Sequence, residues 1–199
     1  MSPLKIYRLL LAAYITLFIL CAISPYDRTV WFSENLPIVI LVIFIAFASR
    51  HYRFSNISYF CMFALPLLHT IGGHYTFERV PFDFITDTFG FERNHYDRIA
   101  HFSVGFYAYP IAEFLLKRGV VVNRAAVSIY AVCVIFTVAS VYEIFEWIYA
   151  ISADPSAGLA VLGSQGDIWD AQKDMLADGL GALFAMISFN LIERDKSKS

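Results

Sequence analysis

Seven ionisable residues lie at or just inside one end of long apolar segments in this 199-residue sequence. If the segments alternate across a bilayer, all of these ends reach the same side. A charged side chain at the centre of a membrane helix costs about 2.5–3.5 kcal/mol on insertion scales, so their shared depth predicts a polar pocket open to one membrane face. The seven residues are Asp97, His101, Glu143, Glu146, Asp170, Asp174 and Asp178.

Two pairs within this set have spacings that suit acid–base chemistry. Asp97 and His101 are four residues apart at the start of an expected helix and face the same way. The carboxylate can therefore orient the imidazole and raise its basicity. Glu143 and Glu146 are three apart, an arrangement that suits acid–base work or cation binding. Simpler roles stay open: Asp97 as a helix cap, His101 in an interhelical hydrogen bond, Glu146 at the water interface.

The third group recurs every four residues, at Asp170, Asp174 and Asp178. Four residues advance a helix by about 400°, so these carboxylates stay close to one face. Asp178 is expected about two turns into the membrane, where it needs a partner such as His101, an arginine, a cation or a water-filled cavity. The small residues at 179–182 favour close helix contact.

Imidazole and carboxylate side chains together suit a divalent metal ion, although a set of ligands does not establish that a metal binds. For His69 and His74, hydrogen bonding in the core is the simpler alternative, because a spacing of five is not a usual helical ligand pair. The candidate metal ligands are His69, His74, His101, Glu146 and Asp174. The candidate catalytic residues are Asp97, His101, Glu143, Glu146, Asp174 and Asp178.

The elements that must position these residues are membrane helices. The chain is 58% hydrophobic and 16% charged, with a mean hydropathy of +0.59, whereas soluble domains carry about 25% charged residues. We predict an all-α polytopic membrane protein, a six-helix transmembrane bundle forming one integral membrane domain over residues 1–199. The first segment is expected to be a retained helix rather than a signal peptide. The predicted helices are 4–24, 33–49, 56–73, 97–116, 125–150 and 171–192.

The distribution of basic residues predicts the orientation. Of the 15 lysines and arginines, ten lie on the side of the bundle that carries the termini and five on the other, so the positive-inside rule places both termini in the cytoplasm. On that side, Glu113 and Lys117 have the spacing of a solvated ion pair. The sequence has no basic patch that would suit nucleic acid. Cys21, Cys61 and Cys133 lie in apolar runs and predict no disulfide framework.

The segment DRIAHF at 97–102 is similar to the D-[KR]-x-x-H-F box of the VanZ-like group of small bacterial membrane proteins. Residues 143–147 and the aspartate series 170–182 extend this likeness over the last three predicted helices. The chain resembles still more closely the inner-membrane proteins of the YjdF type, over nearly its whole length, including HTIGGHY at 69–75. The resemblance implies a multi-pass protein of the bacterial inner membrane. Its VanZ-like part implies a role at the cell envelope.

Three functional hypotheses follow. In the first, the pocket faces the periplasm and acts on an envelope lipid or a lipid-linked substrate, with or without a metal. In the second, the protein carries a proton, a cation or a small solute, since membrane carboxylates also mark ion paths. In the third, the polar cluster only holds helices together. The lipid bilayer is the one partner expected in all three. No substrate and no oligomeric state follow from the sequence.

Overall fold

The computed structural model describes residues 1–152, 162 and 165–196, and within them the chain is helical with no strand. The elements are α1 (Pro3–Cys21), α2 (Arg28–His51), α3 (Asn56–Tyr75), α4 (Asp83–Phe89), α5 (Tyr96–Val104), the 3₁₀ turn η1 (Gly105–Tyr107), α6 (Ala108–Lys117), α7 (Arg124–Ser152) and α9 (Asp170–Lys196).

Within these residues, five stretches are long and apolar enough to cross a membrane: α1, α2, the continuous run from α5 to α6, α7 and α9. The all-helical, multi-pass architecture predicted from the sequence is therefore confirmed. The predicted helix 56–73 forms α3, which has 20 residues but is not among the five. Its polar and small residues lower its hydropathy, so the count of six spans stays a prediction.

Helix α2 begins earlier than the predicted residue 33, because Asp27 caps it. The Asp27 carboxylate accepts hydrogen bonds from the backbone N–H groups of Thr29 at 2.8 Å and Val30 at 3.0 Å. These contacts satisfy two of the N–H groups that a helix leaves unpaired at its start. The early start adds a further turn to α2 and thereby places Glu34 inside the helix rather than at its edge.

The predicted helix 97–116 is interrupted at its centre by η1. Pro110 has no N–H to donate to the preceding turn, and Gly105 lies there against the backbone of α9. A Cβ atom on Gly105 would overlap backbone atoms of Gly181 and Ala182, and one on Gly181 would overlap the carbonyl of Phe102. The small residues thus allow α5 and α9 to approach at backbone distance, as they do in membrane helix pairs.

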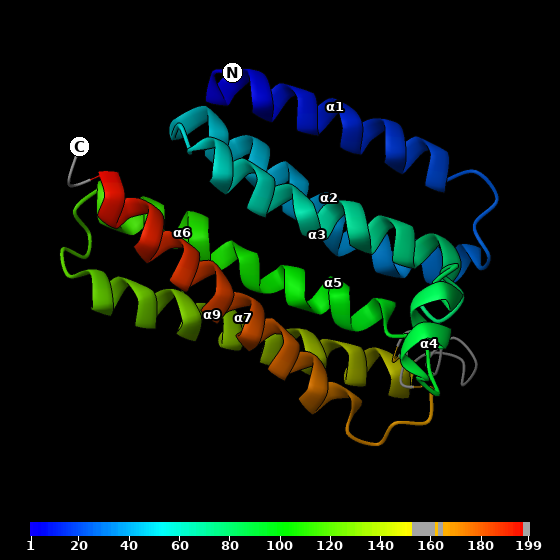
Figure 1. Cartoon of the computed structure of the whole chain (residues 1–199). Helices are drawn as coiled ribbons and strands as arrows, with labels where there is room; N and C mark the ends of the chain where they lie inside the picture. Colours follow the sequence, from blue (N-terminus) through cyan, green and yellow to red (C-terminus); the bar gives the residue numbers. More distant parts are fainter. Residues whose placement is uncertain (153–161, 163–164, 197–199) are drawn as a thin grey trace.

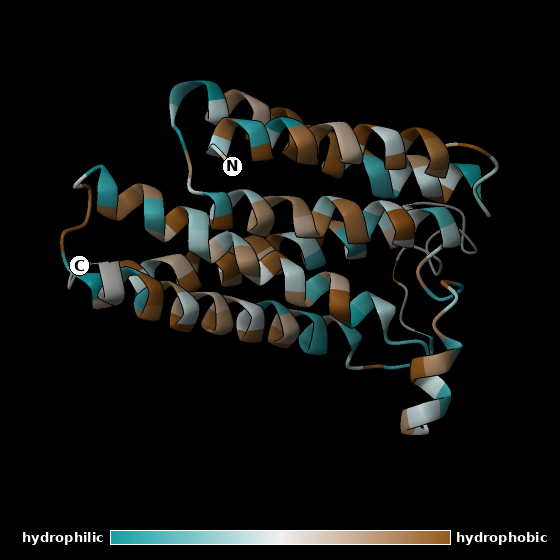
Figure 2. Cartoon of the chain, turned by 45° about the horizontal axis from the view of Figure 1, so that its top comes forward, coloured by the Kyte–Doolittle hydropathy of each residue, from teal (hydrophilic) through white to brown (hydrophobic). Residues whose placement is uncertain are grey.

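The helices form one bundle in which α3 lies between the α1–α2 pair and α5, while α7 and α9 pack on the opposite side (Figure 1). The start of α1 and the end of α9 lie at one end of the bundle, and α4 lies at the other (Figure 1). Figure 2 shows hydrophobic residues along the long helices and hydrophilic residues concentrated near their ends. The packing core includes Tyr59 and Phe63 on one side and Tyr109 and Phe189 on the other.

Glu113 lies in the half of the bundle that carries the chain ends and differs from its prediction. Its ion pair with Lys117 is present at 2.8 Å, but the Glu113 side chain is only 1% exposed, so the predicted solvation is wrong for it. The carboxylate also accepts hydrogen bonds from the backbone N–H of Ser55 at 3.0 Å, from its hydroxyl at 2.6 Å and from the Ser58 hydroxyl. It thereby fixes the start of α3 to α6.

Candidate functional site

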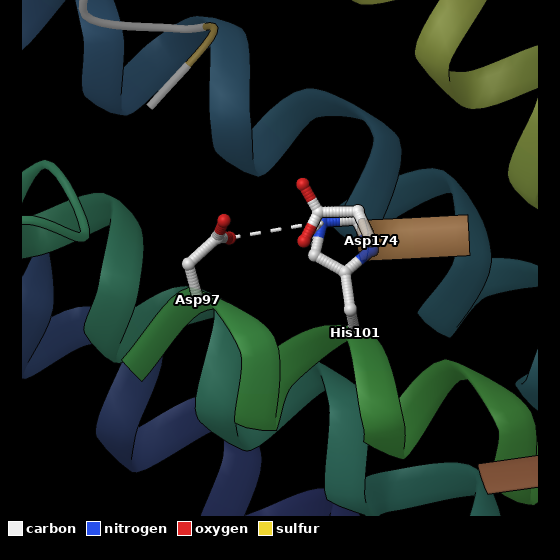
Figure 3. A group of neighbouring side chains, drawn as sticks. All are labelled: Asp97, His101 and Asp174. Carbon is white, nitrogen blue, oxygen red and sulfur yellow. Dashed lines mark ion pairs between the residues drawn. The ribbon is translucent and has the colours of Figure 1, made fainter. Parts of the chain in front are cut away.

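His101 lies at the centre of the polar cluster. Its Nδ1 is 3.3 Å from Asp178 Oδ1, and its Nε2 is 3.7 Å from Asp97 Oδ1 and 3.6 Å from Asp174 Oδ1. Asp97 and His101 extend in the same direction from α5, toward Asp174 of α9 (Figure 3). Steps of four residues along α5 and along α9 therefore bring four of the six predicted catalytic residues into contact. Asp178 has His101 as its partner, one of the partners expected for it.

Arg98 completes the contact between the starts of α5 and α9, and sequence reasoning did not single it out. Its guanidinium donates to Asp170 and Asp174 and lies 3.4 Å from Asp97. Arg93, from the preceding loop, donates to the same Asp170 oxygen at 2.6 Å. The sequence did contain a signal for this role of Arg98. It follows Asp97 at the end of an apolar segment, and a charged side chain at that position needs groups of opposite charge nearby.

A second histidine–carboxylate pair lies on the other wall, between α2 and α3. His69 Nε2 lies 3.1 Å from Glu34 Oε2 and 3.1 Å from the Glu34 carbonyl oxygen. Both side chains are buried. The sequence analysis did not select Glu34, although an acidic residue inside an apolar segment was a signal for it.

The two pairs line one cavity of about 210 Å³. Glu146 of α7 lines it as well and is 9% exposed. Asp97, Asp174 and Tyr142 also line the cavity, and the rest of the lining is apolar, so one cavity joins a set of ionisable side chains to a hydrocarbon wall. This arrangement fits a ligand with a polar head and an apolar tail. The apolar lining residues are Pro37, Ile38, Leu41, Leu65, Phe77, Ala100, Val104, Val138, Ala139 and Leu162.

Two predicted site residues lie outside this lining. Glu143 does not line the cavity, although its charge interacts with His101 and Asp174. One of its carboxylate oxygens is buried without a hydrogen-bond partner among the described residues. His74 is directed elsewhere, since its Nδ1 donates to the Cys21 carbonyl at 2.8 Å. Glu146 and His69 line the cavity, but neither belongs to the closest group of possible metal ligands.

That closest group is Asp97, His101 and Asp174. One ligand atom from each lies within 4.8 Å of the other two. It shares His101 and Asp174 with the predicted ligand set and adds Asp97, which the sequence analysis placed only among the catalytic residues.

Charged neighbours act on two residues next to the cluster, Asp167 and His95. Lys173 donates to Asp167 at 2.6 Å, and this hydrogen bond lowers the pKa of the Asp167 carboxyl below its ordinary value of 3.8. Burial, followed by the nearby cations Arg93 and Arg98, lowers the pKa of His95 below 6.5. His95 therefore favours its neutral form just before α5 begins.

Comparison with known proteins agrees with this architecture. A sequence model described as "Predicted membrane protein (DUF2238)" matches residues 6–195. The chain is 34% identical over 173 residues to "Inner membrane protein YjdF" of Escherichia coli (strain K12), which covers 86% of this chain and 82% of the relative. No solved structure matches the chain. The YjdF-type resemblance and the inner-membrane location predicted from the sequence are thereby confirmed, whereas the VanZ-like relation stays a prediction. This chain belongs to the DUF2238 family of predicted membrane proteins.

Proposed function

We propose that this protein is a membrane-embedded enzyme that cleaves or transfers a group on an envelope lipid or a lipid-linked substrate, at a cavity open to the periplasm. The observation that carries this proposal is the orientation of His101. Its Nδ1 is held by Asp178, and its Nε2 faces two further carboxylates on the wall of an amphipathic cavity.

The geometry around His101 supports a general base. An ionised carboxylate only accepts hydrogen bonds, so Asp178 selects the tautomer that carries its proton on Nδ1. The Nε2 lone pair is then directed toward the cavity and can take a proton from a water molecule or a substrate hydroxyl. Asp178 stabilises the imidazolium that results. Glu146, which lines the same cavity from α7, is available to return a proton to a leaving group.

The lining of the cavity supports a lipid as substrate. Aliphatic side chains such as Ile38, Leu41 and Val138 line the cavity beside its ionisable groups, so the wall suits a substrate that has a polar head and an apolar tail. The distribution of basic residues supports an opening on the periplasmic side. At the end of the bundle where α1 begins, Arg50 and Lys117 lie in the last turns of α2 and α6, and Arg53 and Arg118 lie in the connections that follow. The start of α5, which carries His101, lies in the opposite half.

The carrier hypothesis has less support. The polar lining residues all lie toward one end, and the rest of the lining described above offers no ionisable side chain that would continue a path toward the other membrane face. A purely structural role is also less consistent with the cavity, because interhelical polar contacts stabilise membrane bundles only modestly, by about 0.6 kcal/mol each. The VanZ-like features of the sequence are in keeping with an envelope substrate.

The test is lipid turnover by the purified protein. Wild type, His101→Gln and His74→Gln are incubated in detergent with a polar lipid extract of a bacterial inner membrane, and products are followed by mass spectrometry. His74 is the matched control, an imidazole outside the cavity. We expect turnover by wild type and His74→Gln and a loss of about 10²–10⁴-fold in His101→Gln, the usual contribution of a general base. Equal turnover by His101→Gln, or none by wild type, contradicts the proposal.

A further inference from the structure

We infer that Asp97, His101 and Asp174 bind one divalent transition-metal cation, Zn²⁺ or Mn²⁺, at the polar end of the cavity. The inference rests on the proposed function and deepens it, since the cation would be the cofactor of the same site. Two of the three residues were already candidates as metal ligands by residue type. The structure supplies the specific set and its geometry.

The separations of the ligand atoms suit a bound ion better than a hydrogen bond. His101 Nε2 is 3.7 Å from Asp97 Oδ1 and 3.6 Å from Asp174 Oδ1, both longer than a hydrogen bond. Ligand atoms about 2.1 Å from a tetrahedral ion lie about 3.4 Å from one another. The two separations from His101 are therefore within a few tenths of an ångström of those around a bound ion, and all three ligand atoms lie within 4.8 Å of one another.

The surroundings of each ligand also fit. Metal-bound histidines usually donate their other ring N–H to a carboxylate, and His101 Nδ1 has this contact with Asp178. Arg98 donates to Asp174 Oδ1, the oxygen that lies 3.6 Å from His101 Nε2, so this oxygen would be shared between the guanidinium and the ion. Ligating carboxylates are commonly held by such hydrogen bonds. Asp178 and Arg98 are positioning residues in this arrangement, because neither would touch the metal.

The charges around the cavity favour a cation. The nearby positive groups are His69, His101 and Arg98, and even with both imidazoles protonated they are outnumbered by carboxylates. No cationic side chain among the described residues forms an ion pair with Glu146, which is more than nine-tenths buried. Buried negative charge in a membrane requires a compensating cation or protons. The lining carboxylates are Glu34, Asp97, Glu146, Asp174 and Asp178.

The ligand types decide the class of metal. An imidazole with two carboxylates suits Zn²⁺ or Mn²⁺, whereas Ca²⁺ and Mg²⁺ prefer sites built from oxygen alone. With three protein ligands, a coordination position stays open for water, whose pKa a zinc ion lowers to about 7. The ion would occupy the Nε2 lone pair of His101, so it would take over the activation of water that His101 performs as a base in the metal-free site. It would thereby supply the nucleophile next to the apolar wall.

The experiment measures metal binding directly. Full-length protein in detergent is stripped with EDTA, titrated with Zn²⁺ or Mn²⁺ alone, and analysed for bound metal by elemental analysis and for metal-dependent thermal stabilisation. We expect about one ion per wild-type chain, since the three ligands form a single site. His101→Ala and Asp97→Asn should bind neither metal at this site. Asp178→Asn should weaken affinity by about 10–100-fold, the usual effect of losing such an orienting carboxylate. His74→Gln is the control and should bind as wild type does.

The outcomes separate the metal site from the catalytic proposal. If wild type binds neither metal, or if His101→Ala and Asp97→Asn both bind as tightly as His74→Gln, the metal site is refuted. Lipid turnover that persists after EDTA and still requires His101 overturns the metal site and leaves the proposed function standing. Metal binding that requires His101, in a protein that turns over no lipid, supports the site and overturns the function. If His101→Ala does not fold, Asp97→Asn still tests the site, because Asp97 lies in the first turn of α5.

Discussion

The contact of His101 Nδ1 with Asp178 Oδ1, at 3.3 Å, joins α5 to α9 one helical turn from the place where Gly105 meets Gly181. The close approach of the two helix backbones at Gly105 and Gly181 therefore determines how far the His101 imidazole lies from the Asp178 carboxylate. The small residues and the ionisable pair depend on each other, because a wider crossing would separate His101 from the group that orients it.

Gly181→Ala tests this dependence. The added methyl group would overlap the Phe102 carbonyl and force α5 away from α9. We expect a loss of stability of about 1–3 kcal/mol, the range for overpacking, together with a loss of lipid turnover. Thermal unfolding in detergent and the turnover assay measure the two effects. Leu183→Ala, at an exposed position of the same helix, should change both little. A stable and fully active Gly181→Ala protein would show that the close crossing is not required.

Arg98→Ala should be among the most destabilising changes in the cluster. It leaves Asp170 and Asp174 without their shared cation, and breaking a buried ion pair from one side costs about 3–5 kcal/mol. Adding Asp174→Asn to Arg98→Ala should restore part of the stability, because Asp170 keeps Arg93 whereas Asp174 loses its arginine. Arg79→Ala breaks an exposed pair with Glu78 and a contact with the ring of Tyr26 and should cost less, about 1–2 kcal/mol. Thermal unfolding of wild type, Arg98→Ala, Asp174→Asn, the double variant and Arg79→Ala forms the test. Additive effects of Arg98→Ala and Asp174→Asn would count against a shared network.

The sequence was sufficient for the parts of the site that helical periodicity controls. Asp97 with His101, and Asp174 with Asp178, are each one turn apart, so helix geometry alone aligns them. Because these residues were predicted at one depth in the membrane, the helices that carry them were expected to lie together. Periodicity did not set the rotation of α7, and Glu143 consequently lies outside the cavity that Glu146 lines.

The parts that the sequence did not predict depend on contacts between helices. The pairing of Glu34 with His69 arises where α2 packs on α3, and neither residue has a partner within its own helix that would reveal it. The burial of Glu113 likewise comes from the turn before α3, whose N–H and hydroxyl groups reach it. In the loop between α3 and α5, aromatic residues without clear periodicity gave no signal for the short helix α4.

Glu113→Ala tests the contact between α6 and the start of α3. The carboxylate receives hydrogen bonds from Ser55 and Ser58 as well as from Lys117. Hydrogen bonds to a charged group contribute about 1.5–3 kcal/mol each, so we expect a decrease of about 3 kcal/mol or more in the free energy of unfolding. Lys117→Ala removes one exposed partner and should cost about 1 kcal/mol or less. Similar effects of the two substitutions would refute the buried role of Glu113.

His95 predicts a dependence of stability on pH. Burial and nearby cations lower its pKa below 6.5 in the folded protein. Between this folded value and 6.5 the unfolded chain binds more protons, so stability falls as the pH decreases through 6.5 and levels off below the folded value. His95→Gln removes the titrating group. We expect acidification from neutral pH to below 6 to lower the unfolding temperature of wild type more than that of His95→Gln. Equal decreases in the unfolding temperatures of the two proteins would show that His95 does not cause the pH dependence.

The most direct test of the central claim is the accessibility of the site from outside the cell. In a background without Cys21, Cys61 and Cys133, single cysteines at Asp97, Phe84 and Val122 are exposed to a cationic, membrane-impermeant thiol reagent. Phe84 and Val122 are exposed positions at opposite ends of the bundle and serve as controls. A periplasm-facing site predicts labelling of Asp97→Cys and Phe84→Cys in intact cells with a permeable outer membrane, and of Val122→Cys only after lysis. Labelling of Val122→Cys in intact cells, with Asp97→Cys unlabelled until lysis, would contradict it.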